Sequence, residues 1–106
     1  MINKDNLLNA LKNEMKKFII ERDLPGAGEF TEQELQEIAK TSCDTIDSMG
    51  KPYHWLQTFV TGDKMYCVHI ASDDEIIKEH SSRAGFPVKS IREIKTIIDP
   101  TTSVRR

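Results

Sequence analysis

The chain has 106 residues, of which 38% are hydrophobic and 30% charged, and its formal net charge is −2. These values are typical of a single soluble domain, and the scattered Lys and Arg residues argue against a nucleic-acid-binding surface. No apolar run approaches the ~20 residues that span a bilayer, and no secretory signal precedes the first expected strand. Two cysteines are too few for a disulfide framework, so we expect a cytoplasmic protein with no membrane partner.

The sequence divides into three parts. Residues 1–14 are expected to form an N-terminal helical extension, because Leu7 and Leu11 begin an apolar pattern at helical spacing. Residues 15–100 are predicted to form the globular domain, and residues 101–106 a flexible tail. A helix as short as the extension is marginal on its own, so its role stays open.

The domain is predicted to begin with a strand over residues 17–23, which Pro25 ends because proline cannot extend a ladder. A long helix follows: Thr31 and Glu34 fit a capping box, and Gly50 is typical of a helix end. Its predicted inward stripe consists of Leu35, Ile38, Ala39, Ser42, Cys43, Ile46 and Met49. Cys43 is therefore interpreted as a packing residue.

A β-hairpin is predicted over residues 53–71, with Gly62-Asp63 as a two-residue turn. The regular register that follows from this turn pairs Thr58 with Cys67, Leu56 with His69, and His54 with Ala71 on one sheet face. The same register pairs Phe59 with Tyr66, Gln57 with Val68, and Trp55 with Ile70 on the other, more aromatic face.

A second long helix is predicted after the hairpin, with Ser72 as N-cap, Glu75 completing a capping box, and Gly85 as C-cap. Its inward stripe is expected to contain Ile76, Ile77, His80 and Ala84. The last strand is predicted within residues 88–98, before Asp99-Pro100.

The fold class that these elements predict is α+β. Their order is β-α-β-β-α-β, which is typical of the ferredoxin-like arrangement with a four-stranded antiparallel sheet. Two helices can cover only one face of that sheet, whereas apolar residues occur on both faces. We therefore expect a homodimer through the uncovered sheet face, in the form of a dimeric α+β barrel.

Four sequence features carry a resemblance to a known family. They are ERDLPG at residues 21–26, Trp55 followed by Tyr66-Cys67-Val68, EH at residues 79–80, and AGFP at residues 84–87. Over residues 15–100 the chain resembles the small bacterial nickel-binding, nickel-responsive proteins. The resemblance implies a ferredoxin-like homodimer whose two sheets pack face to face, with divalent metal binding in some members. His69 departs from the family pattern, where an aromatic residue is expected.

The candidate metal ligands fall into two groups, because nickel and other divalent transition metals accept imidazole, thiolate and carboxylate donors. The first choice is Asp23, Cys67 and His80, which the topology predicts at one end of the sheet. The second choice is His69 and His54 on the hairpin, with oxygen from Glu21 or Glu93.

Each candidate also has a purely structural interpretation. His80 on an apolar stripe is often a core histidine, Cys67 is often a small buried hydrophobe, and Asp23 fits a turn. His54 and His69 fit solvated or interfacial positions. The sequence has no phosphate-binding loop and no nucleophile elbow, which favours a binding protein over an enzyme. The alternative to metal binding is a small-molecule-binding or catalytic dimeric α+β barrel.

Overall fold

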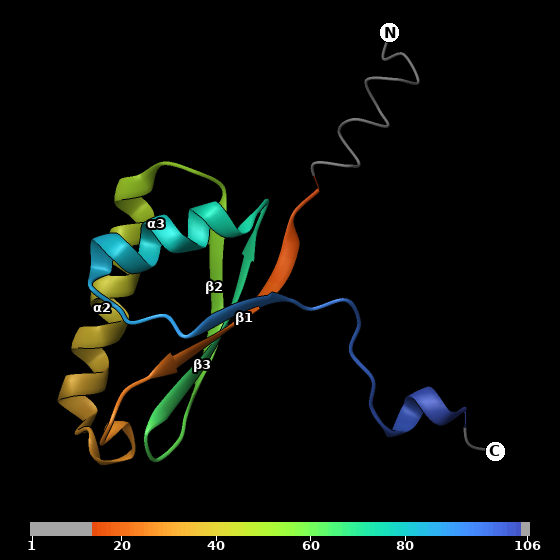
Figure 1. The fold of residues 1–106 in the computed structure, drawn as a ribbon, viewed down its shortest axis with the longest axis horizontal. Helices are drawn as coiled ribbons and strands as arrows, with labels where there is room; N and C mark the ends of the chain where they lie inside the picture. The colour runs from red at the N-terminus through yellow and green to blue at the C-terminus, as the bar shows by residue number, and fades with distance from the viewer. Residues whose placement is uncertain (1–13, 105–106) are drawn as a thin grey trace, which may run out of the picture.

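The computed structural model describes residues 14–104, which build a four-stranded antiparallel sheet and two main helices (Figure 1). The strands are β1 (Lys16–Asp23), β2 (Tyr53–Val60), β3 (Lys64–Ala71) and β4 (Ser90–Glu93). The helices are α2 (Glu32–Met49) and α3 (Asp74–Ala84), with short 3-10 turns η1 (Ala27–Glu29) and η2 (Pro100–Ser103). The α+β class and the β-α-β-β-α-β order are confirmed, whereas the predicted N-terminal helix falls almost wholly outside the described residues.

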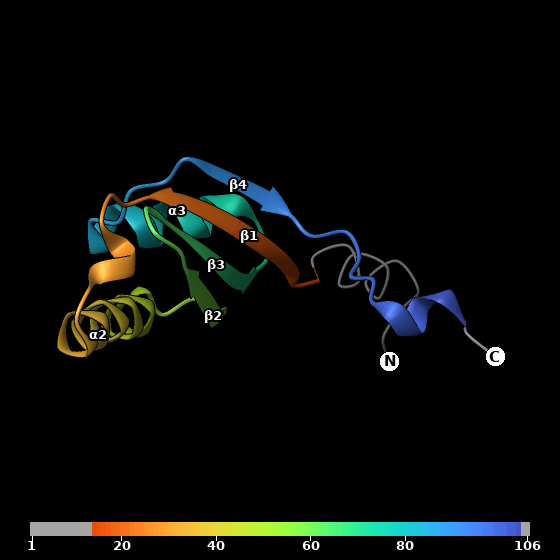
Figure 2. The same cartoon turned by 90° about the horizontal axis from the view of Figure 1, so that it is seen from below.

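The sheet has the strand order β2-β3-β1-β4, consistent with a ferredoxin-like fold. Both helices lie on the same side of it, as the two perpendicular views in Figures 1 and 2 show. The core lies between the helices and this inner face, where Phe18, Ile20 and Ile77 are buried. No helix among residues 14–104 is long and apolar enough to cross a membrane.

The helix ends follow the local sequence closely. Thr31 and Glu34 form the predicted capping box at the start of α2, and Gly50 ends this helix in the left-handed conformation with φ 62°. Gly85 ends α3 in the same way. The predicted N-cap of α3 is wrong by one residue, because the Asp73 carboxylate, and not the Ser72 hydroxyl, accepts from the backbone N–H of Ile76.

The inward stripe of α2 is confirmed except at Cys43, which is exposed. Ser42, which was also predicted on this stripe, is 5% exposed. The neighbouring predicted positions Ile38, Ala39 and Ile46 are half-buried. A polar serine therefore faces the core from the middle of α2.

The hairpin has the predicted register only near its turn. Thr58 lies opposite Cys67 and Phe59 opposite Tyr66, but the register shifts between Trp55 and Gln57. This β-bulge adds one residue to β2, so Trp55 lies opposite His69 and His54 opposite Ile70. The predictions that Leu56 faces His69 and that Trp55 joins the outer face are therefore wrong.

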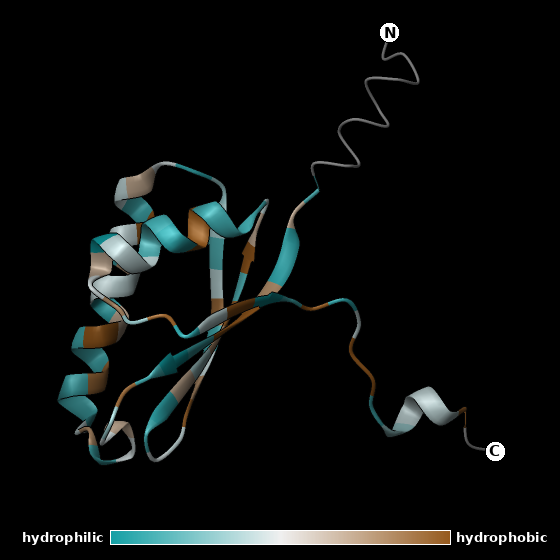
Figure 3. Cartoon of the chain, viewed as in Figure 1, coloured by the Kyte–Doolittle hydropathy of each residue, from teal (hydrophilic) through white to brown (hydrophobic). Residues whose placement is uncertain are grey.

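The last strand is shorter than predicted, because only Ser90–Glu93 pair with β1. The chain then leaves the sheet and runs to η2, which Asp99 caps (Figure 1). Ile97 and Ile98 in this connection are 68% and 75% exposed, and the connection is partly brown in Figure 3. Two large apolar side chains between β4 and η2 are therefore uncovered.

Candidate ligand-binding cavity

A cavity of about 380 Å³ lies between the inner sheet face and the two helices. Its lining is mostly apolar and includes Leu35 and Ile38 of α2 and Met65 of β3. Three basic side chains, Arg22 of β1, His69 of β3 and His80 of α3, line the same cavity. They are only 3%, 1% and 1% exposed, so the polar centre of the cavity is desolvated.

Arg22 reaches the cavity because the pleat of β1 places it on the same face as Phe18 and Ile20. Its Nε donates to Cys67 Sγ at 3.4 Å, and its Nη1 donates to Ser81 Oγ and to the carbonyl of Pro87, both at 3.0 Å. Its Nη2 is buried without a hydrogen-bond partner.

The Arg22 guanidinium also lies over the ring of Phe86, 5.4 Å from its centroid. Hydrogen bonds and a cation–π contact thus hold the planar group from several sides. No described carboxylate forms an ion pair with it among residues 14–104. The result is an ordered and deeply buried positive charge that no described acidic residue neutralises.

The two histidines come from different elements and lie close together. The ring centroids of His69 and His80 are 5.5 Å apart, and each ring centroid is 5.2 Å from that of Tyr53. His80 Nε2 shares a hydrogen bond with Ser42 Oγ at 3.1 Å. The remaining ring nitrogens, both of His69 and Nδ1 of His80, are buried without partners, as is the Tyr53 hydroxyl.

Both histidines are neutral at neutral pH. Burial is the main cause that lowers the pKa of His69 to about 3, with further lowering by His80 and Arg22. Burial likewise lowers the pKa of His80 to about 4, with Arg22 as the second cause and Ser42 opposing it. Burial also raises the pKa of Tyr53, which keeps its hydroxyl protonated. Each neutral imidazole offers one donor and one acceptor.

Cys67 belongs to a short hydrogen-bonded chain at the side of the cavity. Trp55 Nε1 donates to Thr58 Oγ1 at 2.9 Å, and Thr58 Oγ1 donates to Cys67 Sγ at 3.2 Å. Arg22 donates to the same sulfur. Cys67 is 6% exposed, so it lies within the wall of the cavity.

The structure brings together part of each group of predicted metal ligands. Cys67 and His80 from the first group and His69 from the second all line the cavity. Asp23 does not join them, because the pleat of β1 directs it to the opposite face from Arg22. Glu21 lies on that outer face for the same reason.

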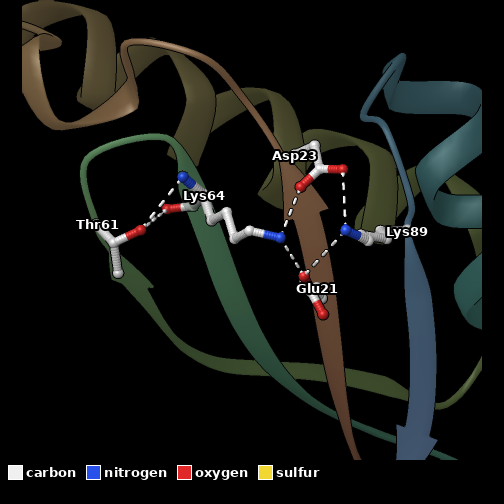
Figure 4. A network of polar contacts seen from close by, with 5 residues as sticks. All are labelled: Glu21, Asp23, Thr61, Lys64 and Lys89. Carbon is white, nitrogen blue, oxygen red and sulfur yellow. Dashed lines mark hydrogen bonds and ion pairs between the residues drawn. The ribbon is translucent and has the colours of Figure 1, made fainter.

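The two carboxylates are instead part of a surface ion cluster (Figure 4). Lys64 pairs with Glu21 and lies 2.9 Å from Asp23, and Lys89 lies 3.9 Å and 3.7 Å from the same two carboxylates. Hydrogen bonds from Lys64 are the main cause that lowers the pKa of both Glu21 and Asp23. These carboxylates are therefore ionised at neutral pH, and Lys64 and Lys89 balance their negative charge at the surface.

The remaining candidates of the second group are also separated from the cavity. His54 is exposed and shares the outer face with Ile70, because the β-bulge shifts its register. Glu93 pairs with Lys95 at 3.1 Å. Within the described range 14–104, no three His, Cys, Asp or Glu side chains converge to hold a metal ion.

Sequence reasoning did not single out Arg22, Ser42 or Tyr53. A signal for Arg22 was present, because alternation along β1 places it with Phe18 and Ile20. A signal for Ser42 was also present, because it lies on the predicted inward stripe of α2. The inward position of Tyr53 depends on the β-bulge and has no comparable signal in the sequence.

Comparisons with known proteins place the chain in a family. A solved structure, described as the crystal structure analysis of SCO4226 from Streptomyces coelicolor A3(2), has a similar fold with a TM-score of 0.65. It is 17% identical, and the match covers 77% of this chain and 99% of that chain. No curated protein matches the sequence. The family model "Nickel responsive protein SCO4226-like" matches residues 18–94, so the chain belongs to this family.

Proposed function

We propose that this protein binds a small organic molecule in the cavity between its sheet and its helices. One observation carries this proposal: Arg22, His69 and His80 are buried, have polar atoms without partners, and line one cavity. Buried polar groups are nearly always hydrogen-bonded in native proteins, so unpartnered ones that share a cavity favour a polar occupant. The volume of about 380 Å³ lies at the small end of the range of ~300–1,000 Å³ for ligand sites.

The contacts of the cavity favour binding over catalysis. Cys67 accepts hydrogen bonds from Arg22 and Thr58, and His80 shares a hydrogen bond with Ser42. A thiol nucleophile would need a base within hydrogen-bond reach, and no such contact is made between Cys67 and a described histidine. The polar groups are thus arranged as donors and acceptors for a ligand.

A cavity-filling substitution tests this function. Ala39 lines the cavity from α2, so Ala39→Trp should occupy ligand volume without changing the polar centre. Lys40→Trp is the matched control, because Lys40 is exposed on the same helix. We expect small aromatic and aliphatic compounds to raise the Tm of the parent protein and of Lys40→Trp, but not of Ala39→Trp. Equal shifts in all three proteins would place binding outside the cavity.

A second candidate function is binding of nickel or another divalent transition metal, which the family description favours. His69, His80 and Cys67 would be the donors, since the two neutral imidazoles have unpartnered nitrogens. As described, these residues do not fit a preformed centre, because no three donors converge among residues 14–104. The charge of Arg22 also opposes a second positive charge beside the imidazoles.

Calorimetric titration with nickel chloride separates the two candidates. If nickel binds through the cavity, His80→Gln should abolish the saturable heat, whereas His54→Gln on the outer face should preserve it. Saturable binding that survives His69→Gln and His80→Gln would assign the metal to other residues. Absence of saturable heat with the parent protein would remove this candidate.

We further propose that the protein forms a homodimer through the outer sheet face. Phe59 and Leu56 of β2 are 54% and 49% exposed, and the connection after β4 exposes Ile97 and Ile98. Large apolar side chains exposed in such numbers are typical of interfaces.

Phe59→Ala should weaken the dimer by roughly 2 kcal/mol, about thirtyfold in Kd. Sedimentation equilibrium measures this change, and Trp55→Ala is the control, since Trp55 lines the cavity.

A further inference from the structure

We propose that the ligand of this cavity is a small organic anion, with a carboxylate or similar oxyanion on an apolar body, and that Arg22 binds its charge. This inference rests on the proposed ligand-binding function and specifies the chemical class of the ligand. Three properties of the cavity support it: the unneutralised charge of Arg22, the geometry of its guanidinium, and the donors beside it.

The charge of Arg22 is the first argument. The side chain is 97% removed from solvent, since only 3% is exposed. Its neighbours along β1, Glu21 and Asp23, are on the other face and are already paired with Lys64 and Lys89. A buried charge without a counter-charge is strongly unfavourable, so an anion that enters the cavity gains a large electrostatic interaction.

The geometry of the guanidinium is the second argument. Nε and Nη1 are occupied by Cys67, Ser81 and the carbonyl of Pro87, which leaves Nη2 as the buried nitrogen without a partner. Because these contacts and Phe86 hold the group in place, little conformational entropy is lost when Nη2 binds an oxyanion. Arginine bound to a carboxylate makes charge-assisted hydrogen bonds, which are stronger than neutral ones.

The neighbouring histidines are the third argument. A neutral imidazole can donate one hydrogen bond, and His69 has both of its ring nitrogens unpartnered. A carboxylate has two oxygens, so one that binds Arg22 keeps acceptor capacity for a histidine that lines the same cavity. The apolar lining, which includes Leu35, Ile38 and Met65, fits a hydrocarbon or aromatic body attached to the acid.

The positive charge of Arg22 also favours anions over cations and neutral molecules as ligands of the cavity. Arg22 contributes to the lowered pKa of both histidines, so the cavity already resists a proton. The same positive field opposes a metal cation or an organic amine and attracts an anion. A neutral ligand would gain hydrogen bonds but would leave the charge of Arg22 without a counter-charge.

Matched pairs of acid and amide test the proposal by isothermal titration calorimetry in Tris buffer at pH 7.5. The probes are benzoate with benzamide and 4-phenylbutyrate with 4-phenylbutyramide, which differ in charge and little in shape. We expect at least one acid to bind ten times more tightly than its amide. Arg22→Met should abolish this preference, and Lys64→Met, which removes a positive charge from the outer face, should preserve it.

The outcomes distinguish this inference from the function on which it rests. If an acid and its amide bind equally well and Ala39→Trp blocks both, the cavity binds ligands but the anion class is wrong. If none of the four probes binds, the proposed class and the proposed function both fail.

A preference for the acid that survives in Arg22→Met would show that another group binds the charge. A second measurement does not depend on the folding of that variant. In the parent protein, 4-phenylbutyrate should shift the imidazole NMR signals of His69 and His80 and leave those of His54 unchanged.

Discussion

The charged residues on the two faces of β1 differ in their exposure to solvent and in whether an opposite charge neutralises them. On the outer face, Glu21 and Asp23 are paired with Lys64 and Lys89 at the surface. On the inner face, Arg22 is buried, and no described acid neutralises it. Three consecutive charged residues therefore have different roles, because the pleat alternates their directions. The difference teaches that an uncompensated charge is informative only where water is excluded.

The largest loss of stability should result from truncating Ile20, the apolar neighbour of Arg22 on the inner face of β1. Ile20 is fully buried, so Ile20→Ala should lower the free energy of unfolding by about 3–4 kcal/mol in urea unfolding. Ile19→Ala on the outer face is the matched control and should cost less than half as much at protein concentrations that dissociate the proposed dimer. Equal losses would show that the outer face is covered as thoroughly as the inner one.

The second-largest effect should be a loss of stability on acidification, which the two buried histidines of the inner side cause. His69 and His80 have pKa values of about 3 and about 4 when folded, below the usual 6.5, so the unfolded chain binds more protons between these limits. Stability should therefore be nearly constant above about pH 8 and fall by about 1 kcal/mol or more per pH unit from pH 6.5 to pH 4.5.

The outer-face carboxylates should act in a lower pH window. The pKa values of Glu21 and Asp23 are lowered from 4.5 and 3.8. Their stabilisation is therefore fully present above those values and is lost below them, as the pH falls through the lowered pKa values.

Urea unfolding of His69→Gln/His80→Gln should show a flatter profile between pH 6.5 and pH 4.5. An unchanged slope in this variant would show that other groups cause the loss.

A smaller effect should appear in the titration of a single histidine. Because Arg22 contributes to the lowered pKa of His80, Arg22→Met should raise that pKa, as measured by NMR of the imidazole. Lys64→Met removes the same charge from the outer face and should leave the pKa of His80 unchanged. A similar rise in both variants would mean that the two faces are not electrostatically separate.

The smallest effect should come from the outer cluster itself. At protein concentrations that dissociate the proposed dimer, Lys64→Met should shift the urea midpoint less than any inner-face variant, because exposed ion pairs contribute little and salt screens them. Repeating the unfolding at 1 M sodium chloride should remove the remaining difference from the parent protein. A large, salt-independent loss would show that the cluster is shielded from solvent, as it would be within a dimer interface.

The sequence predicted those features that depend on local chemistry. The capping box of Thr31 and the left-handed Gly50 and Gly85 depend on a few adjacent residues, so the boundaries of α2 and the end of α3 were predictable. The pairing of Thr58 with Cys67 followed from the turn that is nearest to it. These features need no information from the rest of the fold.

The candidate site was only partly predictable, because it depends on distant contacts. His80 was expected on the inner side, whereas the sheet face that carries Cys67 was left open. Asp23 was grouped with them from its position along β1 and not from the face on which it lies. Trp55 lies on the inner face because of the β-bulge, and no residue type in the sequence predicts that bulge. The burial of Arg22 depends on α3 and Phe86, far along the chain.

The bulge in β2 also has an evolutionary consequence. It sets which side chains before Gln57 point inward, so Tyr53 and Trp55 reach the core side only because the strand contains one additional residue. Deletion of Leu56 would restore the regular pleat and exchange the two faces of this strand segment. In this part of the protein, a one-residue change in length would therefore remodel the cavity wall more than most substitutions.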